Sequence, residues 1–301
     1  MITDLALVLT TLIWGTTFVT VKDALADVAP IRFLVLRFSV AAIVLFAVAL
    51  LTRARFDRAT WRAGAIASIP FFLTFVTQTS GLLWASPATS AFLTGFSVVL
   101  VPLFSVVLLR RPIGAWTWTG AACAFIGLAA LTLRGDWTIG VGEVLTLGTA
   151  IACAAHVLVL ERVAPGKSAA ALTAVQVLGS VVLALLTLPL DHLVFGRGGG
   201  YAGLLAPLPR GALLAVLYMG CVGTALAFFL QTWAQARMSA TRVGVLFTLE
   251  PVFALLFSVA QGREHFAVRS TLGMALILAG MLIVETIGRR ETRESGDPSR
   301  R

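Results

Sequence analysis

The chain has 301 residues, of which 58% are hydrophobic and 12% charged, and its formal net charge is +9. So large an apolar share excludes an ordinary water-soluble protein and makes lipid the main solvent. The basic residues lie in short segments between apolar runs and in the C-terminal tail, not on one continuous face, so nucleic-acid binding is not predicted.

Apolar runs long enough to cross a bilayer recur along the chain. They predict an all-α integral membrane protein with ten transmembrane helices, near residues 4–22, 32–52, 62–84, 88–109, 114–133, 141–161, 169–190, 211–235, 241–261 and 269–288. The first run follows Asp4 with no basic segment before it, which predicts an uncleaved helix rather than a removed signal peptide. Residues 191–210 form the longest predicted loop, and residues 289–301 a disordered cytoplasmic tail.

Basic residues in the short loops predict the orientation, because such loops stay on the cytoplasmic side. With the N-terminus inside, fifteen arginines and lysines lie on the inner side and seven on the outer side. This distribution predicts that both termini are cytoplasmic. Arginine greatly outnumbers lysine, which occurs only at Lys22 and Lys167, as is typical of GC-rich bacterial genomes. The predicted location is therefore the inner membrane of a bacterial cell.

The two halves of the chain resemble each other in the order of their motifs. The run ATSAFLTGFSVVLVPLFSVVLL in the fourth predicted helix matches ATRVGVLFTLEPVFALLFSVAQ in the ninth, with Pro102 and Pro251 in corresponding places. We therefore predict two five-helix repeats, residues 1–135 and 136–288. Because five is odd, the second repeat enters the membrane from the opposite side, and such inverted repeats are typical of secondary transporters.

These features carry a resemblance to a known family. The pair Trp14-Gly15, the two five-helix halves and the run from Tyr218 to Glu264, especially SATRVGVLFTLEPVFALLFS, resemble the EamA group of the drug/metabolite transporter superfamily. The resemblance implies a permease for a small metabolite. Two positions depart from the family pattern: Ala154 stands where members often have an aromatic residue, and Gly262-Arg263-Glu264 replaces a simple Gly-Glu.

Glu250 is the strongest candidate for a binding or coupling residue. An ionisable group deep in a membrane helix costs about 2.5 to 3.5 kcal/mol on insertion scales and needs a reason to be there. Glu250 directly precedes Pro251, whose ring removes a helical hydrogen bond and predicts a kink. Pro102 is the corresponding predicted kink of the first repeat. The carboxylate is expected either to face a wet cavity, binding a solute ammonium or a proton, or to fix helix packing.

Six further polar or aromatic side chains are candidates for the lining of a solute site. They are His156, Trp14, Gln78, Gln176, Gln231 and Arg37. His156 is predicted as a proton relay, a hydrogen-bonding wall or a packing residue, and the glutamines as solute ligands or interhelical contacts. Arg37 is expected to contact an anionic group, or else to snorkel or pair with Asp23 or Asp27.

The favoured function is secondary transport of a small metabolite, such as an amino acid or a drug-like compound, by alternating access and in the direction of export. An uncoupled facilitator of the same fold is the alternative, and an intramembrane enzyme is the weaker one, because the sequence has no HExxH motif and only three histidines. No cofactor is expected. The expected partners are a small solute, with a proton as a candidate companion, the lipid bilayer, and a second copy of the chain through the small residues of the fifth and tenth helices.

Overall fold

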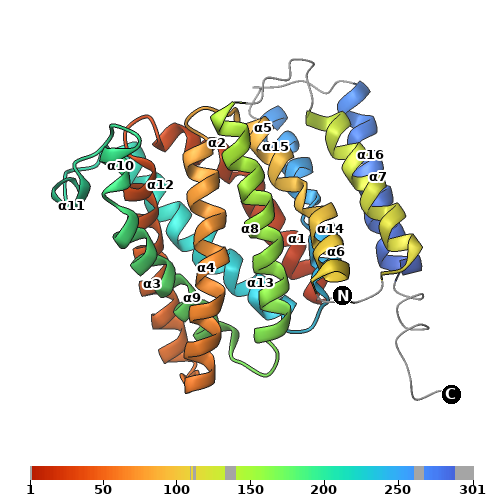
Figure 1. The fold of residues 1–301 in the computed structure, drawn as a ribbon, viewed down its shortest axis with the longest axis horizontal. Coiled ribbons are helices and arrows are strands. Elements are labelled where there is room, and N and C mark those ends of the chain that lie inside the picture. The colour runs from red at the N-terminus through yellow and green to blue at the C-terminus, as the bar shows by residue number, and fades with distance from the viewer. Residues whose placement is uncertain (1, 109, 111–112, 133–139, 261–267, 289–301) are drawn as a thin grey trace.

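The computed structural model describes residues 2–108, 110, 113–132, 140–260 and 268–288, and these residues form helices with no strand among them (Figure 1). The helices before residue 133 are α1 (Ile2–Gly15), α2 (Thr17–Ala24), α3 (Pro30–Leu51), α4 (Arg58–Gly81), α5 (Pro87–Gly95), α6 (Ser97–Val107) and α7 (Ala115–Thr132). The later helices are α8 (Val141–Val163), α9 (Ala169–Thr187), α10 (Leu190–Leu193), α11 (Gly200–Gly203), α12 (Arg210–Tyr218), α13 (Ala227–Gln235), α14 (Ala240–Leu246), α15 (Leu249–Ala260) and α16 (Val268–Ile283). Two π-helical segments, η1 (Met219–Leu226) and η2 (Val284–Gly288), continue α12 and α16.

The prediction of an all-helical membrane protein is confirmed for the described residues. Eight helical segments are long and apolar enough to span a bilayer, namely Ile2–Ala24, Pro30–Leu51, Arg58–Gly81, Thr89–Val107, Val141–Val163, Ala169–Thr187, Arg210–Gln235 and Ala240–Phe257. The other two predicted spans correspond to α7 and α16, whose apolar stretches, Ala115–Ala130 and Thr271–Ile283, are shorter. The ten-span count therefore stays a prediction, and the predicted tail lies outside the described residues.

Local sequence signals mark the starts of several helices. Pro30 and Pro87 occupy first-turn positions, where the missing N–H removes no helical hydrogen bond. Ser86 caps α5 by accepting a hydrogen bond from the Thr89 N–H at 3.1 Å. Asp57 caps α4 in the same way through Thr60 at 2.7 Å, and these hydrogen bonds lower the pKa of the Asp57 carboxyl.

The predicted loop at residues 191–210 is not entirely irregular, because it contains the single-turn helix α11 and most of α10. Buried Asp191 of α10 accepts hydrogen bonds from the first-turn N–H groups of α3, from Ile31 at 2.9 Å and Arg32 at 2.7 Å. These bonds satisfy donors that the helix itself leaves unpaired. The segment thus anchors the start of α3, the helix that carries Arg37.

Large apolar side chains cover the outside of the bundle. Ile43 of α3 and Leu186 of α9 are 72% and 68% exposed, as suits a lipid-facing surface. At one edge of the bundle, α7 and α16 pack side by side (Figure 1). Their backbones approach closely: a Cβ added to Gly127 would lie 2.6 Å from the carbonyl oxygen of Gly273. Small residues of α7 and α16 therefore serve a contact within the chain, and the predicted contact with a second copy stays a prediction.

Four helical segments near the centre of the bundle are interrupted. In the first segment, α1 ends at Gly15 and α2 begins after Thr16. In the second segment, α5 and α6 are separated by Phe96. The long segment from α12 to α13 contains the π-helical η1, and α14 ends at Leu246 before α15 begins at Leu249. Interrupted helices leave backbone groups and side-chain directions that a regular helix does not offer, and such helices surround the sites of many transporters.

Candidate functional site

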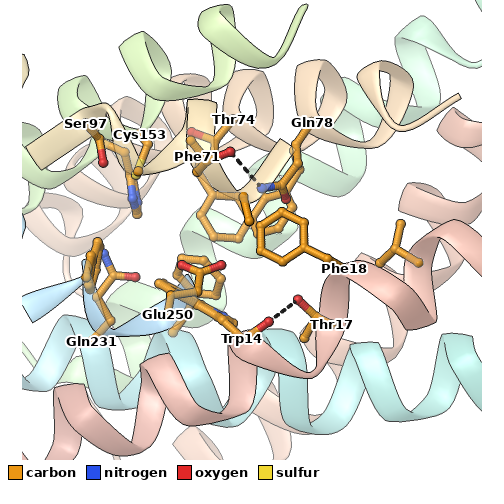
Figure 2. A pocket seen from close by; sticks show the side chains of 18 of the residues that line it. Trp14, Thr17, Phe18, Phe71, Thr74, Gln78, Ser97, Cys153, Gln231 and Glu250 are labelled. Atoms are coloured by element: carbon orange, nitrogen blue, oxygen red, sulfur yellow. Dashed lines mark hydrogen bonds between the residues drawn. The ribbon is translucent and has the colours of Figure 1, made fainter. Parts of the chain in front are cut away.

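A cavity lies among the interrupted helices and is lined by residues of α1–α6, α8, α13 and α15, together with Phe247 of the α14–α15 junction (Figure 2). It contains about 790 Å³ of space not occupied by atoms, counted out to its open mouth and including open solvent there. Most of its wall is aromatic or aliphatic. A few polar side chains converge on it, which is the composition expected of a site for a small solute.

Six of the seven predicted binding residues line this cavity, namely Glu250, His156, Trp14, Gln78, Gln231 and Arg37. Pro251 lines it as well, whereas Gln176 and Pro102 do not. Pro102 is buried inside α6. The residues come from both halves of the chain, so only the tertiary structure brings them together.

The interruption between α14 and α15 places Glu250 at the cavity. Pro251 has no N–H, and a continuous helix would require that N–H to bond the carbonyl of Phe247, four residues earlier. The Phe247 carbonyl instead accepts a tighter-turn hydrogen bond from the Glu250 N–H at 3.0 Å. The sequence predicted a kink at Pro251, and the structure has a break that begins at Phe247. Glu250 is therefore a first-turn residue of α15 rather than a mid-helix residue.

Trp14 lies against the same break. Its ring packs on Phe247 and Phe228 with centroids 5.2 and 5.0 Å away, and its indole Nε1 donates a hydrogen bond to the Gly223 carbonyl of η1 at 3.2 Å. The neighbouring Gly15 permits this approach, since a Cβ there would lie 2.9 Å from the Ala254 nitrogen of α15. The Trp-Gly pair is thus the contact between the α1–α2 break and α15.

Arg37 is 2% exposed and lies between the cavity and η1. Its Nε donates to Thr224 Oγ1 at 2.6 Å, its Nη2 lies 3.4 Å from the Gly223 carbonyl, and its guanidinium stacks over Phe75 at 4.4 Å. The predicted alternative of an ion pair with Asp23 or Asp27 is wrong among the described residues, because these hydroxyl, carbonyl and aromatic partners surround the guanidinium instead. Arg37 brings a buried positive charge to the cavity wall.

His156 is also buried and lines the cavity from α8. Its Nε2 lies 3.2 Å from Gln176 Oε1, and its ring meets Phe71 edge-on at 5.3 Å. Gln176 therefore stands behind the histidine and orients it, rather than facing the cavity. This contact agrees with the predicted alternative of an interhelical contact, and a role as solute ligand stays a prediction.

The two glutamines that do face the cavity come from different helices. Gln78 of α4 donates through Nε2 to Thr94 Oγ1 of α5 at 3.4 Å. Gln231 of α13 donates through Nε2 to Gln235 Oε1 at 2.7 Å. Figure 2 shows the oxygen of Gln231 pointing toward the middle of the cavity, where the Glu250 carboxylate also lies.

Sequence reasoning missed several cavity residues. Cys153 is not among the predicted site residues but lines the cavity one turn before His156, and Phe71 and Phe228 form much of the apolar wall. The spacing of three between Cys153 and His156 places both on one helix face and is a usable signal. Ala154, the departure from the family pattern, is fully buried outside the cavity, and Gly262-Arg263-Glu264 lies outside the described residues.

The site offers charge, hydrogen bonds and aromatic surface, but no metal-ligand set: among the described residues, no three His, Cys, Asp or Glu side chains come together. A carboxylate and a guanidinium share a mostly apolar enclosure, where electrostatic interactions with a solute are stronger than in water. The arrangement suits reversible binding of a small polar or charged molecule.

Comparisons with known proteins agree with this reading. The model of the EamA-like transporter family matches residues 1–133 and 140–286. An uncharacterized transporter of Archaeoglobus fulgidus is 28% identical over 281 residues, covering 93% of this chain and 85% of that protein. The uncharacterized transporter YoaV of Bacillus subtilis is 22% identical over 286 residues, covering 93% and 95% of the two chains.

A solved crystal structure supports the fold alone. It superimposes with a TM-score of 0.76 at 20% sequence identity and covers 96% of this chain and 98% of its own. The family match, the helices long enough to span a bilayer and the transporter relatives together indicate a membrane transporter rather than an enzyme. The chain belongs to the EamA-like transporter family.

Proposed function

We propose that this protein is a secondary transporter that exports a small metabolite by alternating access, with the central cavity as its solute site. The observation that carries the proposal is the convergence of Glu250, Arg37, His156 and two glutamines on one cavity bounded by interrupted helices. An ionisable group at this depth is costly unless it serves a site or a partner. Glu250 would bind a cationic group of the solute or a proton, and Arg37 would attract an anionic group.

The proposed architecture is two inverted five-helix repeats, residues 1–135 and 136–288, with both termini cytoplasmic and ten spans. Helices α7 and α16 supply the two additional spans. Support comes from corresponding interruptions: the α5–α6 and α14–α15 segments, which carry Pro102 and Pro251, are both broken. Two related halves around one cavity offer two alternative packings, each open to one side of the membrane.

Contacts at the end of the bundle where α1 begins support the proposal that the cavity is closed on that side of the membrane in this conformation. Arg242 of α14 pairs with Asp4 of α1 at 2.5 Å. The Ala240 N–H of α14 donates to the Glu161 carboxylate of α8 at 3.2 Å. The Arg242–Asp4 pair joins the two halves beyond the cavity, whereas the Ala240–Glu161 bond joins two helices of the second half. Alternating access requires that the pair between the halves separate when this side opens.

The test is solute loss from liposomes loaded with a mixture of amino acids, nucleosides and small organic cations, at two internal pH values. Vesicles holding the purified protein are compared with empty vesicles. Selective, saturable loss of one class is expected, and its response to internal pH reports whether a proton takes part. Loss that rises linearly with concentration would favour a facilitator, and no selective loss from folded, inserted protein would contradict the proposal for these solutes.

The proposed setting is the inner membrane of a bacterial cell, with a lipid bilayer and the solute as the partners that the mechanism needs. A homodimer through the outer faces of α7 and α16 is the proposed assembly. Their glycine-containing faces are already engaged with each other, so a dimer contact would use the opposite faces.

A further inference from the structure

Gln235 is buried beneath the cavity wall and does not line the cavity itself. It lies one helical turn after Gln231 on α13, and its amide links that residue to α8. Gln235 Nε2 donates to the Val157 carbonyl at 3.0 Å, and Gln235 Oε1 accepts from Gln231 Nε2 at 2.7 Å. The two amides therefore form a chain of hydrogen bonds that ends on a backbone carbonyl.

The carbonyl at the end of this chain fixes the direction of every bond in it. A backbone carbonyl has no hydrogen and only accepts, so Gln235 must turn its NH₂ group toward Val157. Its oxygen then faces Gln231, which must present its own NH₂ group in return. The Gln231 oxygen is then on the side of its amide that faces away from Gln235, toward the cavity, and reversing either amide would set two donors or two acceptors against each other.

The cavity-facing oxygen has no hydrogen-bond partner within the described part of the chain. Gln231 is 1% exposed, and its Oε1 is buried without a donor. A buried acceptor without a hydrogen-bond partner costs free energy. An arrangement that keeps the Gln231 oxygen in this position is therefore explained if a bound solute donates a hydrogen bond to it. Glu250, which lines the same cavity, receives no hydrogen bond from the described residues either. Two acceptors thus share one side of the cavity.

Three donor-bearing side chains of the cavity wall give hydrogen bonds to other protein groups rather than to these two acceptors. The indole of Trp14 donates to Gly223, the amide of Gln78 to Thr94, and Arg37 to Thr224. A ligand that complements the Glu250 side must therefore bring its own donors. A primary ammonium group carries three N–H donors and a positive charge, which suits one neutral and one anionic acceptor.

We propose that Gln235 is a positioning residue that holds Gln231 as a hydrogen-bond acceptor, so that the cavity prefers solutes with an N–H-bearing cation over cations without N–H donors. The inference rests on the proposed solute site and names the chemistry of its occupant. Glu250 attracts any cation by charge, whereas Gln231 distinguishes cations by their hydrogen-bond donors.

The experiment compares two probes that differ in their donors, 2-phenylethylammonium and its N,N,N-trimethyl derivative. Their aromatic ring suits the wall formed by Trp14, Phe71 and Phe228. Binding to the purified full chain in lipid nanodiscs is measured by isothermal titration calorimetry. The wild-type protein is expected to bind the primary ammonium roughly tenfold or more tightly, because hydrogen bonds to charged groups are the strong class.

Gln235→Met is expected to lower the preference for the primary ammonium over the trimethyl derivative by roughly fivefold or more. Residue 235 does not line the cavity, but without its amide the Gln231 side chain can present either its oxygen or its NH₂ group to the solute. Gln231→Met should lower the ratio at least as much, and it carries the test if Gln235→Met does not fold. A protonated carboxyl in Gln235→Glu accepts from Gln231 and donates its O–H to the Val157 carbonyl, so this variant is expected to restore most of the preference at a pH where that carboxyl is neutral. Thr173→Val, a buried near-isosteric change outside the cavity, is the control and should leave the ratio unchanged.

A wild-type ratio retained in both Gln235→Met and Gln231→Met would overturn the proposal. So would the absence of 2-phenylethylammonium binding to the wild-type protein. In that second case the liposome assay still decides the proposed function separately, because selective flux of a solute without an ammonium group would uphold transport while removing the assigned solute chemistry.

Discussion

The interrupted helices at the centre of the bundle contrast with the α7–α16 pair at its edge. Helix α7 runs for 18 residues, and it contributes no residue to the cavity. Its glycines instead meet the backbone of α16. At the centre, the breaks next to Gly15, Phe96 and Phe247 coincide with polar side chains around an open space. Regular helices allow close packing in lipid, whereas interrupted helices provide the irregular surface that a solute site needs.

Removing the carboxylate at the central break should have the largest effect on function. Glu250→Gln keeps the shape of the side chain but removes its charge, and we expect solute flux to fall roughly ten- to a hundredfold, the usual range for losing a hydrogen bond to a charged group. The liposome assay measures the flux, and size-exclusion chromatography shows whether the protein stays folded.

The matched control for this change is Glu143→Gln. Glu143 accepts the Gly140 N–H at 2.9 Å at the start of α8 and does not line the cavity, and glutamine retains an acceptor there. Unchanged flux is expected. Normal, pH-responsive transport by Glu250→Gln would remove Glu250 from the mechanism. It would also weaken the functional contrast between the interrupted helices around the cavity and the α7–α16 pair.

At the edge, a single methyl group should disturb stability rather than solute binding. The Cβ of Gly127→Ala would lie 2.6 Å from the Gly273 carbonyl oxygen and 2.7 Å from the Ile277 nitrogen, so α7 and α16 must separate. We expect a loss of about 1–3 kcal/mol, the usual cost of overpacking, seen as a lower thermal unfolding temperature in detergent.

Gly148→Ala on α8 tests the same substitution where space exists, because its nearest neighbour would be Thr77 at 3.6 Å. Little change in unfolding temperature is expected there. If Gly127→Ala instead altered solute affinity while leaving stability intact, the edge pair would have to be counted as part of the transport machinery.

The smallest effect is expected outside both regions, at the carboxylate that caps α3. Burial raises the pKa of Asp191 above its usual value, and the hydrogen bonds from Ile31 and Arg32 only partly oppose that shift. The folded state therefore holds the proton to higher pH than the unfolded state. The stability contributed by this group is greatest at low pH and declines as pH rises from about 3.9 through the raised pKa.

Asp191→Asn should remove this pH dependence and cost about 0.5–1.5 kcal/mol at neutral pH, because the amide NH₂ cannot accept the second backbone hydrogen bond. Thermal unfolding measured at several pH values between about 4 and 7 checks both expectations. If the stability of the wild-type protein rises with pH across this window, and Asp191→Asn shows the same rise, then Asp191 does not determine the pH dependence of stability.

The sequence by itself determined which segments are helical and apolar. Proline at 30 and 87 and the caps at Asp57 and Ser86 are local signals, and each stands at the start of an observed helix. The sequence also singled out Glu250, because the cost of an ionisable group in lipid does not depend on tertiary detail. Short-range physics is sufficient for these features.

The tertiary structure alone decided which side of each helix faces the cavity and where each broken helix resumes. Gln176 and Gln231 look alike in sequence, yet one stands behind His156 and the other faces the solute space. Gln235 gains its role only because α13 packs against the Val157 carbonyl of α8. Helix rotation and hydrogen-bond direction depend on neighbours far away in the chain, so no local pattern specifies them.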